Sequence, residues 1–382
     1  MTASEALGPN ESLIDERESR ARLITPALVL DLDAMERNIA AMAAYAADQG
    51  VAIRPHAKTH KSVQIARRQL DAGALGICCA TLGEAEALAA GGIDGLLITS
   101  PVVAPAKINR LMALRRENES LMVTADDMDN LRALEAAAAA SGFVLDMVVD
   151  VDVGLHRTGT RDAATAVAMA EAADASASLR FRGIQGYAGH VQHIEDFGDR
   201  RASSHDNLAP LRDARDSLVE KGIEVPIVTG AGTGTHDIDP EIGLMTELQV
   251  GSYAVMDVEY LDVQARGGGD WRFEPALFVR ATVVSASHDG SATMDAGLKC
   301  FATDGPLPRF HTGVPIGAHY KFFGDEHGRI VFASANERLA IGAALECIVP
   351  HCDPTVNLYD HYHCVRGDTL VDIWPIEARG RH

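Results

Sequence analysis

The sequence predicts a (β/α)₈ barrel of the TIM type followed by a second, C-terminal β-rich domain. Two observations predict this α/β fold class. Short apolar runs alternate with helical stretches up to about residue 262, and beyond it strand-like runs follow one another with no helices between them. Strands that are apolar throughout, each followed by a helix, indicate a buried parallel sheet. About eight such units over roughly 230 residues fit a closed barrel better than an open sheet.

The barrel elements are expected in regular order. The first strand covers residues 27–32, and the first helix covers 33–49, with Asp33 as its N-cap and Gly50 closing it. The later strands are expected over residues 51–57, 76–80, 95–100, 120–125, 145–153, 181–189 and 225–232. The later helices are expected over residues 61–72, 82–92, 105–118, 128–142, 161–175 and 204–222. The segment 246–257 completes the series.

The second domain is read from five runs without helical periodicity: ALFVRATVVSAS, SATMDAGL, RIVFAS, ALECIVP and DTLVDIWPIEA. The stretch QARGGGDW is the expected crossing segment between the domains. The sequence therefore predicts an N-terminal arm over 1–23 that packs on the β domain, the barrel over 24–262, and the β-rich domain over 263–382.

Composition and charge restrict the partners. The 382 residues carry 54 acidic and 34 basic side chains, a formal net charge of −20. Binding to nucleic-acid phosphates or to an anionic membrane requires a positive surface, so neither partner is expected. The sequence has no signal-peptide run, no span of about 20 apolar residues, and no C-x-x-C pair among its six cysteines. These features predict a cytoplasmic protein without a disulfide framework or a structural zinc site.

The stretch RPHAKTHKS, residues 54–62, raises a chemical question. It carries two of only six lysines in a chain with 28 arginines. A lysine amine can lose its proton and attack a carbonyl to form a Schiff base, which a guanidinium cannot do. The alternative is a solvated basic turn. Lys58 ends a predicted barrel strand, and barrel chemistry collects at the carboxyl ends of the strands.

Other polar loops fall at the same rim. They contain Asp150, Asp152, His156 and Arg157, then Tyr187, His190, Gln192 and His193, then the segments TGAGTGTH and GSY. Glycines let backbone N–H groups approach a phosphate, and hydroxyl groups add donors. The candidate phosphate ligands are Gly232 and Thr233 in the first segment and Gly251, Ser252 and Tyr253 in the second. Together with an imine-forming lysine, this cradle suggests pyridoxal phosphate.

These motifs carry a resemblance to a known family. RPHAKTHK and VDVGLHRTG resemble motifs of the alanine-racemase-like (fold type III) pyridoxal-phosphate enzymes, within the group of D-threonine aldolase, D-3-hydroxyaspartate aldolase and D-serine dehydratase. The match runs over nearly the whole chain. The resemblance implies that Lys58 binds the cofactor covalently, that Arg157 and Tyr187 lie at its ring, and that the protein is a homodimer.

A metal site is expected in VPHCDPTVNLYDHYHCVRGD, which begins at Val349. His351 and Asp353 are two residues apart, so on a strand both side chains point to the same side. An imidazole and a carboxylate suit Mn²⁺, Zn²⁺, Mg²⁺ or a similar ion, but isolated H-x-D pairs are common, so the residues alone leave the site open. The resemblance favours it, since the aldolases of this group have H-x-D followed by Pro-Thr here. Cys352 is not assigned to the metal.

The resemblance also implies the reaction. His193 matches a histidine near the substrate's β-hydroxyl group and is the expected base. The expected activity is cleavage of D-3-hydroxy-amino acids, of the D-threonine or D-3-hydroxyaspartate type, to glycine and an aldehyde or glyoxylate. TLGEAE and GLHRTG look more like the dehydratase branch, so a D-serine or D-3-hydroxyaspartate dehydratase is the alternative. A non-catalytic cofactor carrier is disfavoured by the extra β domain and the H-x-D pair.

Overall fold

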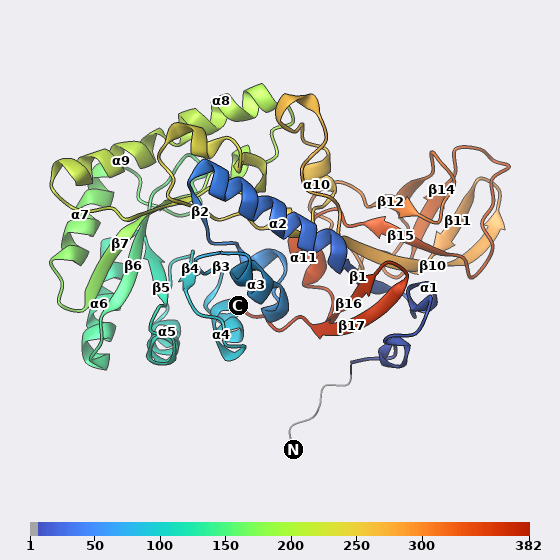
Figure 1. The fold of residues 1–382 in the computed structure, drawn as a ribbon, viewed down its shortest axis with the longest axis horizontal. Helices are drawn as coiled ribbons and strands as arrows, with labels where there is room; N and C mark the ends of the chain where they lie inside the picture. The colour runs from blue at the N-terminus through green and yellow to red at the C-terminus, as the bar shows by residue number, and fades with distance from the viewer. Residues whose placement is uncertain (1–6) are drawn as a thin grey trace, which may run out of the picture.

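The structure, a computed structural model, describes residues 7–382, and these form a barrel sheet and a second sheet (Figure 1). The barrel sheet has eight parallel strands in the order β2-β9-β8-β7-β6-β5-β4-β3. Its strands are β2 (Ala52–Ile53), β3 (Ile77–Cys79), β4 (Leu96–Ile98), β5 (Met122–Ala125), β6 (Leu145–Asp150), β7 (Leu179–Gly186), β8 (Ile227–Gly230) and β9 (Glu247–Leu248). A parallel bridge between His56 and Cys78 joins the end of β2 to β3 and brings the outer strands of this curled sheet together. The predicted fold class is confirmed.

Helices pack on the outside of the barrel strands. They are α2 (Leu32–Gln49), α3 (Val63–Asp71), α4 (Leu82–Ala90), α5 (Pro105–Glu117), α6 (Met128–Ser141), α7 (Ala163–Asp174), α8 (Phe197–Asn207) and α9 (Ala209–Glu220). Helix α2 begins one residue earlier than predicted. Its N-cap is Asp31 and not the expected Asp33, because the Asp31 carboxylate accepts a hydrogen bond from the Ala34 N–H at 3.0 Å. Gly50 ends it with φ of 66°, as expected. The helix predicted over 204–222 is two helices that meet at Leu208.

The second sheet contains nine strands, and one of them comes from the start of the chain. The strands are β1 (Ala27–Asp31), β10 (Leu277–His288), β11 (Ser291–Met294), β12 (Arg309–Thr312), β13 (His319–Phe322), β14 (Gly328–Val331), β15 (Ala344–Ile348), β16 (His361–Arg366) and β17 (Thr369–Pro375). Strand β1 lies between β10, to which it is antiparallel, and β16, to which it is parallel. The expected barrel over 24–262 included this strand, and the structure corrects that boundary. A strand buried on both faces reads alike in either sheet, which is why the sequence did not reveal its place.

The described part of the N-terminal arm contacts the second sheet. The Asp15 N–H donates to the Leu370 carbonyl oxygen at 2.8 Å, and Arg20 pairs with Glu346 at 2.7 Å. Leu13 and Ile14 pack against an apolar cluster formed by residues of the second sheet and its neighbours. Residues 1–6 of the predicted arm lie outside the described residues.

The β domain also holds the loop that follows β2. The Tyr362 hydroxyl donates to the His60 carbonyl oxygen at 2.7 Å, and the Ala378 N–H donates to the Lys61 carbonyl oxygen at 3.0 Å. The short helix α11 (Cys352–Val356) leads from β15 toward the barrel, and α10 (Val258–Leu261) stands where the barrel chain leaves for the second sheet (Figure 1). The mouth of the barrel at β2 is therefore bordered by the second domain.

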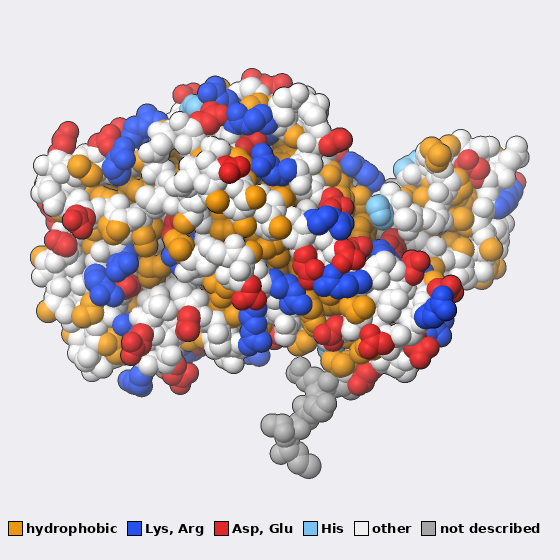
Figure 2. All heavy atoms as spheres, in the orientation of Figure 1, with side chains coloured by type: hydrophobic (Ala, Val, Ile, Leu, Met, Phe, Trp, Pro, Cys, Tyr) orange, Lys and Arg blue, Asp and Glu red, His pale blue; other side chains and the backbone are white. Residues whose placement is uncertain are grey.

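Charged side chains of both signs lie on the surface, and the described helices are amphipathic or short. On the face drawn in Figure 2, acidic and basic side chains are interspersed, without a large basic area. Among residues 7–382, none of the helices combines the length and the apolar character needed to span a bilayer.

Candidate active site

Lys58 lies at the mouth of the barrel, in the short 3₁₀ helix η2 (Ala57–Thr59) that follows β2. Its side chain is 39% exposed, and Nζ is 3.8 Å from Asp353 Oδ2. The Asp353 carboxylate raises the pKa of Lys58 above its ordinary value, and this outweighs the opposing effect of burial. Lys58 is therefore an ammonium in this state, and it must lose a proton before it can attack a carbonyl.

Lys61 has a different, structural role. Its Nζ is 2.5 Å from Glu84 Oε1, and both side chains are almost fully buried. The residue has a φ of 52° and precedes α3, which begins at Val63, so it is not the helix residue that was expected. The two lysines of the RPHAKTHKS stretch are thus separated by environment: one is buried in an ion pair, and the other opens into a cavity.

The cavity in front of Lys58 collects most of the predicted cofactor residues. Its lining includes Lys58, Arg157, Tyr187, Gly232, Thr233, Gly251 and Ser252, together with His56, Thr59, Gln185, Gln249 and Tyr260, which the sequence did not single out. The Arg157 guanidinium lies over the Tyr187 ring at 5.6 Å. Tyr253 is the exception. Its ring is buried against Phe273, and only its N–H, which donates to Thr233 Oγ1 at 3.0 Å, supports the cavity wall.

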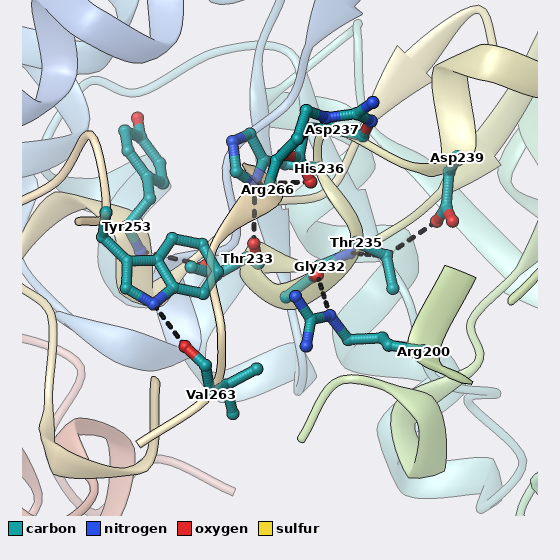
Figure 3. A network of polar contacts seen from close by, with 12 residues as sticks. Arg200, Gly232, Thr233, Thr235, His236, Asp237, Asp239, Tyr253, Val263 and Arg266 are labelled. Carbon is teal, nitrogen blue, oxygen red and sulfur yellow. Dashed lines mark hydrogen bonds and ion pairs between the residues drawn. The ribbon is translucent and has the colours of Figure 1, made fainter. Parts of the chain in front are cut away.

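Two glycines in this lining are required by close packing. A Cβ atom at Gly232 would come within 2.5 Å of Gln192 Oε1, and one at Gly251 would come within 2.5 Å of Thr59 Oγ1. Each glycine precedes a short 3₁₀ helix, η4 (Thr233–Thr235) or η6 (Ser252–Ala254), and the N–H group of the first residue in such a helix has no partner within the helix. Figure 3 shows Gly232 and Thr233 at the start of η4. Backbone donors beside small residues and two hydroxyl groups fit a phosphate group.

His351 and Asp353 meet as the sequence predicted, although not on a strand. Strand β15 ends at Ile348, and His351 is the N-cap residue of α11. His351 Nε2 lies 3.1 Å from Asp353 Oδ2, and His351 Nδ1 lies 2.9 Å from Asp304 Oδ2. The first turn of α11 brings His351 and Asp353 together. The expectation that the two side chains share one side of a strand was therefore wrong.

The pair offers one imidazole nitrogen and one carboxylate, which are atoms that could bind a divalent ion. Asp353 Oδ1 is buried without a hydrogen-bond partner among the described residues. Burial alone would lower the pKa of His351, but the hydrogen bond and charge of Asp353 and the charge of Glu259 raise it to about 9. An ion that binds Nε2 must therefore displace a proton. Within residues 7–382, no set of three or more His, Cys, Asp or Glu side chains is arranged around one point, so the pair would supply two protein ligands.

Cys352 does not join the pair. Its side chain is fully buried, and Sγ donates to Asp257 Oδ2 at 2.9 Å. Asp257 also caps α10 by accepting from the Tyr260 N–H at 3.1 Å. One carboxylate thus fixes the starts of α10 and α11 relative to each other.

His193 lies just beyond η3 (Gly189–Val191), beside the cavity of Lys58 rather than in its lining, and it borders a neighbouring surface pocket together with Glu259. Its ring lies against Tyr260, with centroids 4.6 Å apart, and its Nδ1 is 3.6 Å from Glu259 Oε2. Burial, followed by the charge of His351, lowers the pKa of His193, so this imidazole is neutral at pH 7 and can accept a proton. Glu259 was missed because only the tertiary fold brings it to both histidines. His190 turns away: its Nε2 contacts Asn207 at 3.1 Å, and it lines neither the cavity of Lys58 nor the neighbouring pocket of His193.

The fold and the site together define a class, that of alanine-racemase-like proteins with a lysine at the barrel mouth. Residues 30–258 match the family described as "Alanine racemase, N-terminal domain", and the chain belongs to that family. Residues 276–365 match a "Putative serine dehydratase domain".

Among proteins of known activity, the chain is similar to two aldolases. It is 39% identical to a 3-hydroxy-D-aspartate aldolase of Paracoccus denitrificans (strain Pd 1222), over 94% of this chain and 92% of the relative. It is 40% identical to a D-threonine aldolase of Arthrobacter sp., over 94% of each chain. The crystal structure of D-threonine aldolase from Filomicrobium marinum superimposes with a TM-score of 0.90 at 37% identity, over 94% of this chain and 96% of that one. A D-threo-3-hydroxyaspartate dehydratase of Delftia sp. (strain HT23) is 28% identical, over 92% of this chain and 97% of the relative.

Proposed function

We propose that the protein is a lyase that depends on pyridoxal phosphate and a divalent metal and cleaves D-3-hydroxy-amino acids to glycine and an aldehyde or glyoxylate. One observation carries the proposal: the cavity lysine stands beside a candidate phosphate cradle and 3.8 Å from Asp353 of the His351–Asp353 pair, and His193 packs on Tyr260, which lines the same cavity. The similarity to aldolases of D-threonine and 3-hydroxy-D-aspartate supports this choice of reaction.

The cavity residues would hold the cofactor. Lys58 would attach it through the side-chain amine, and the phosphate would lie against Gly232, Thr233, Gly251 and Ser252. Arg157 and Tyr187 would orient the ring from the opposite loops. Pyridoxal phosphate supplies an electron sink for the electron pair left on the substrate's α-carbon.

His351 and Asp353 would hold the divalent ion, Mn²⁺, Mg²⁺ or Zn²⁺. The Lewis-acid chemistry that such an ion supplies is a lower pKa for the substrate hydroxyl group. Asp304 contacts the other ring nitrogen of His351 at 2.9 Å, and such a carboxylate partner fixes the tautomer of a ligating imidazole. Because Asp353 lies 3.8 Å from Lys58 Nζ, a substrate whose amine took the place of the lysine amine would bring its β-hydroxyl group near the pair.

His193 would move the proton. Its Nδ1 faces Glu259, which leaves Nε2 free for the β-hydroxyl group. The O–H proton passes to this imidazole, the Cα–Cβ bond breaks as the carbonyl forms, and the α-carbon takes up a proton to give glycine. The Tyr260 ring against His193 limits the positions that the base can take.

The alternative is a dehydratase that uses the same parts to break a different bond. The match of residues 276–365 to a putative serine dehydratase domain favours it as a second candidate. In that reaction the α-proton and the β-hydroxyl group leave, and the products are an oxoacid and ammonia.

A product assay separates the two reactions. Purified protein with pyridoxal phosphate and Mn²⁺ is given D-threonine, D-3-hydroxyaspartate or D-serine, and glycine and ammonia are quantified. We expect glycine formation that depends on the metal and is lost in Lys58→Ala and His351→Ala. His190→Ala is the control and should still form glycine, because His190 contacts Asn207 and lies outside the cavity. Ammonia without glycine would reject the aldolase and identify the dehydratase.

We also propose that the enzyme works as a homodimer in the cytoplasm. Several large apolar side chains of the second domain are exposed, with Ile316 98% exposed and Ile341 70% exposed, which suits a protein interface. All six cysteines are unpaired, which suits a reducing compartment. Sedimentation equilibrium should give about twice the chain mass of 40.6 kDa, and a monomer would contradict the proposed dimer.

A further inference from the structure

A fully buried arginine stands behind the active-site loops. Arg200 lies in the first half of α8, and its side chain has no solvent exposure. All of its hydrogen-bond acceptors are backbone carbonyl oxygens: Gly234 at 2.9 Å, Ile194 at 2.6 Å, Glu195 at 3.3 Å and Gln264 at 2.5 Å. Figure 3 shows its guanidinium beneath the loop of Gly232, Thr233 and Thr235.

The acceptors come from three separate segments of the site. Gly234 belongs to η4, in the loop expected to hold the phosphate. Ile194 and Glu195 directly follow the candidate base His193. Gln264 lies in the crossing segment to the second domain, and its N–H also donates to the Glu195 carbonyl oxygen at 3.0 Å. A planar guanidinium with five donors can join three backbone segments in this way, whereas the compact ammonium of lysine cannot.

The residue before His193 is fixed to the same phosphate loop. Gln192 is buried, its Oε1 accepts from the Gly234 N–H at 3.0 Å, and its Nε2 donates to Thr235 Oγ1 at 3.0 Å. The Thr235 hydroxyl donates in turn to the buried Asp239 at 2.8 Å. His193 is therefore flanked on both sides by residues whose contacts lead to η4.

We propose that Arg200 and Gln192 are positioning residues that clamp the loop bearing His193 to the loop that would hold the cofactor phosphate, so that cofactor binding sets the position of the base. The inference deepens the proposed function and rests on it for the roles of the two loops. Neither residue touches the substrate. Both act through the backbone on either side of His193, and a phosphate that orders η4 would order residues 188–195 with it.

The test is hydrogen–deuterium exchange of the full-length protein, with and without pyridoxal phosphate. In the wild type we expect the cofactor to slow amide exchange in residues 231–235 and also in 188–195. Arg200→Lys keeps the charge but cannot reach all three segments, so exchange should still slow in 231–235 while the effect on 188–195 is lost. Arg201→Ala removes the neighbouring, half-exposed arginine, which pairs with Glu241 at 2.6 Å, and should behave as the wild type.

Gln192→Met provides a second route, because it removes the amide contacts while keeping a long side chain, and it decides the question if Arg200→Lys does not fold. At saturating cofactor, both variants should lower kcat about tenfold or more, with KM changed less than about threefold. Residues 188–195 that respond to the cofactor equally in the wild type and the folded variants, or that do not respond in the wild type, would overturn the inference. If the wild type produces no glycine, the proposed function fails, whereas the exchange result still decides whether the loops are coupled.

Discussion

Gly251→Ala tests the cofactor cradle at its closest contact. A methyl group at this position would lie 2.5 Å from Thr59 Oγ1 and 3.4 Å from the His56 carbonyl oxygen. The first distance is about 1 Å short of an ordinary contact, and the second is acceptable. The backbone itself does not oppose the change, since φ at Gly251 is −121°. The strain therefore falls on Thr59, the neighbour of Lys58 in η2.

Overpacking of this kind costs about 1–3 kcal/mol. If the cost is relieved by widening the cradle, the dissociation constant of pyridoxal phosphate should rise about 5- to 150-fold. The constant is measured by absorbance titration of the cofactor-free protein at fixed pH. Lys58 stays in place chemically, so the covalent attachment should still form at high cofactor concentration.

A double-mutant cycle shows whether the contact with Thr59 carries the cost. Thr59→Ala removes the crowding atom and should restore much of the affinity in the Gly251→Ala background, with an interaction free energy of about 0.5–3 kcal/mol. Thr59→Val places a methyl group where Oγ1 was, and it should not restore the affinity. An unchanged dissociation constant in Gly251→Ala, or equal rescue by Ala and Val, would refute the reasoning.

Three further predictions follow from the site and its surroundings. Lys61→Met leaves the charge of the buried Glu84 without its cationic partner, so it should lower the free energy of unfolding by about 3–5 kcal/mol in urea denaturation. Lys58→Met, by contrast, should abolish covalent cofactor attachment with little loss of stability. Burial raises the pKa of Asp239 to about 7, so the folded state keeps a proton that the unfolded chain loses. Stability should therefore fall by up to about 4 kcal/mol as the pH rises from about 4 to 7, and Asp239→Asn should flatten this dependence. Because burial lowers the pKa of His193, the fall of kcat toward acid pH should have its midpoint below pH 6.5. His193→Gln should lower kcat about 10²- to 10⁴-fold. A midpoint above pH 7 in the wild type would contradict the role of His193 as the base.

The sequence predicted the barrel and most of the cavity because both depend on local patterns. Apolar runs alternating with amphipathic helices indicate a parallel sheet wherever they occur, and the barrel rule then places loop residues such as Lys58 and Arg157 at one mouth. Glycines at 232 and 251 were singled out as phosphate residues, and the structure adds the packing reason for each.

The features that the sequence did not reveal depend on contacts between distant segments. Asp304 and Glu259 approach His351 only because the β domain folds back on the barrel, and neither lies in a motif. The sequence also did not predict that the Tyr253 ring is buried against Phe273. A residue in a glycine-rich turn can face a ligand with its backbone while its side chain packs in the core. Arg200 resembles any other arginine of an exposed helix in the sequence, although its side chain is buried.

The place of β1 has a consequence for the order in which the chain is synthesised. This apolar strand leaves the ribosome long before its partners β10 and β16, which begin only at Leu277 and His361. The barrel can form in the meantime, whereas β1 must wait with its edges unpaired, a state that favours aggregation. A fragment that begins at β10 would lack a central strand of its sheet. The second domain therefore completes folding only when β1 and the strands from Leu277 onward are both present.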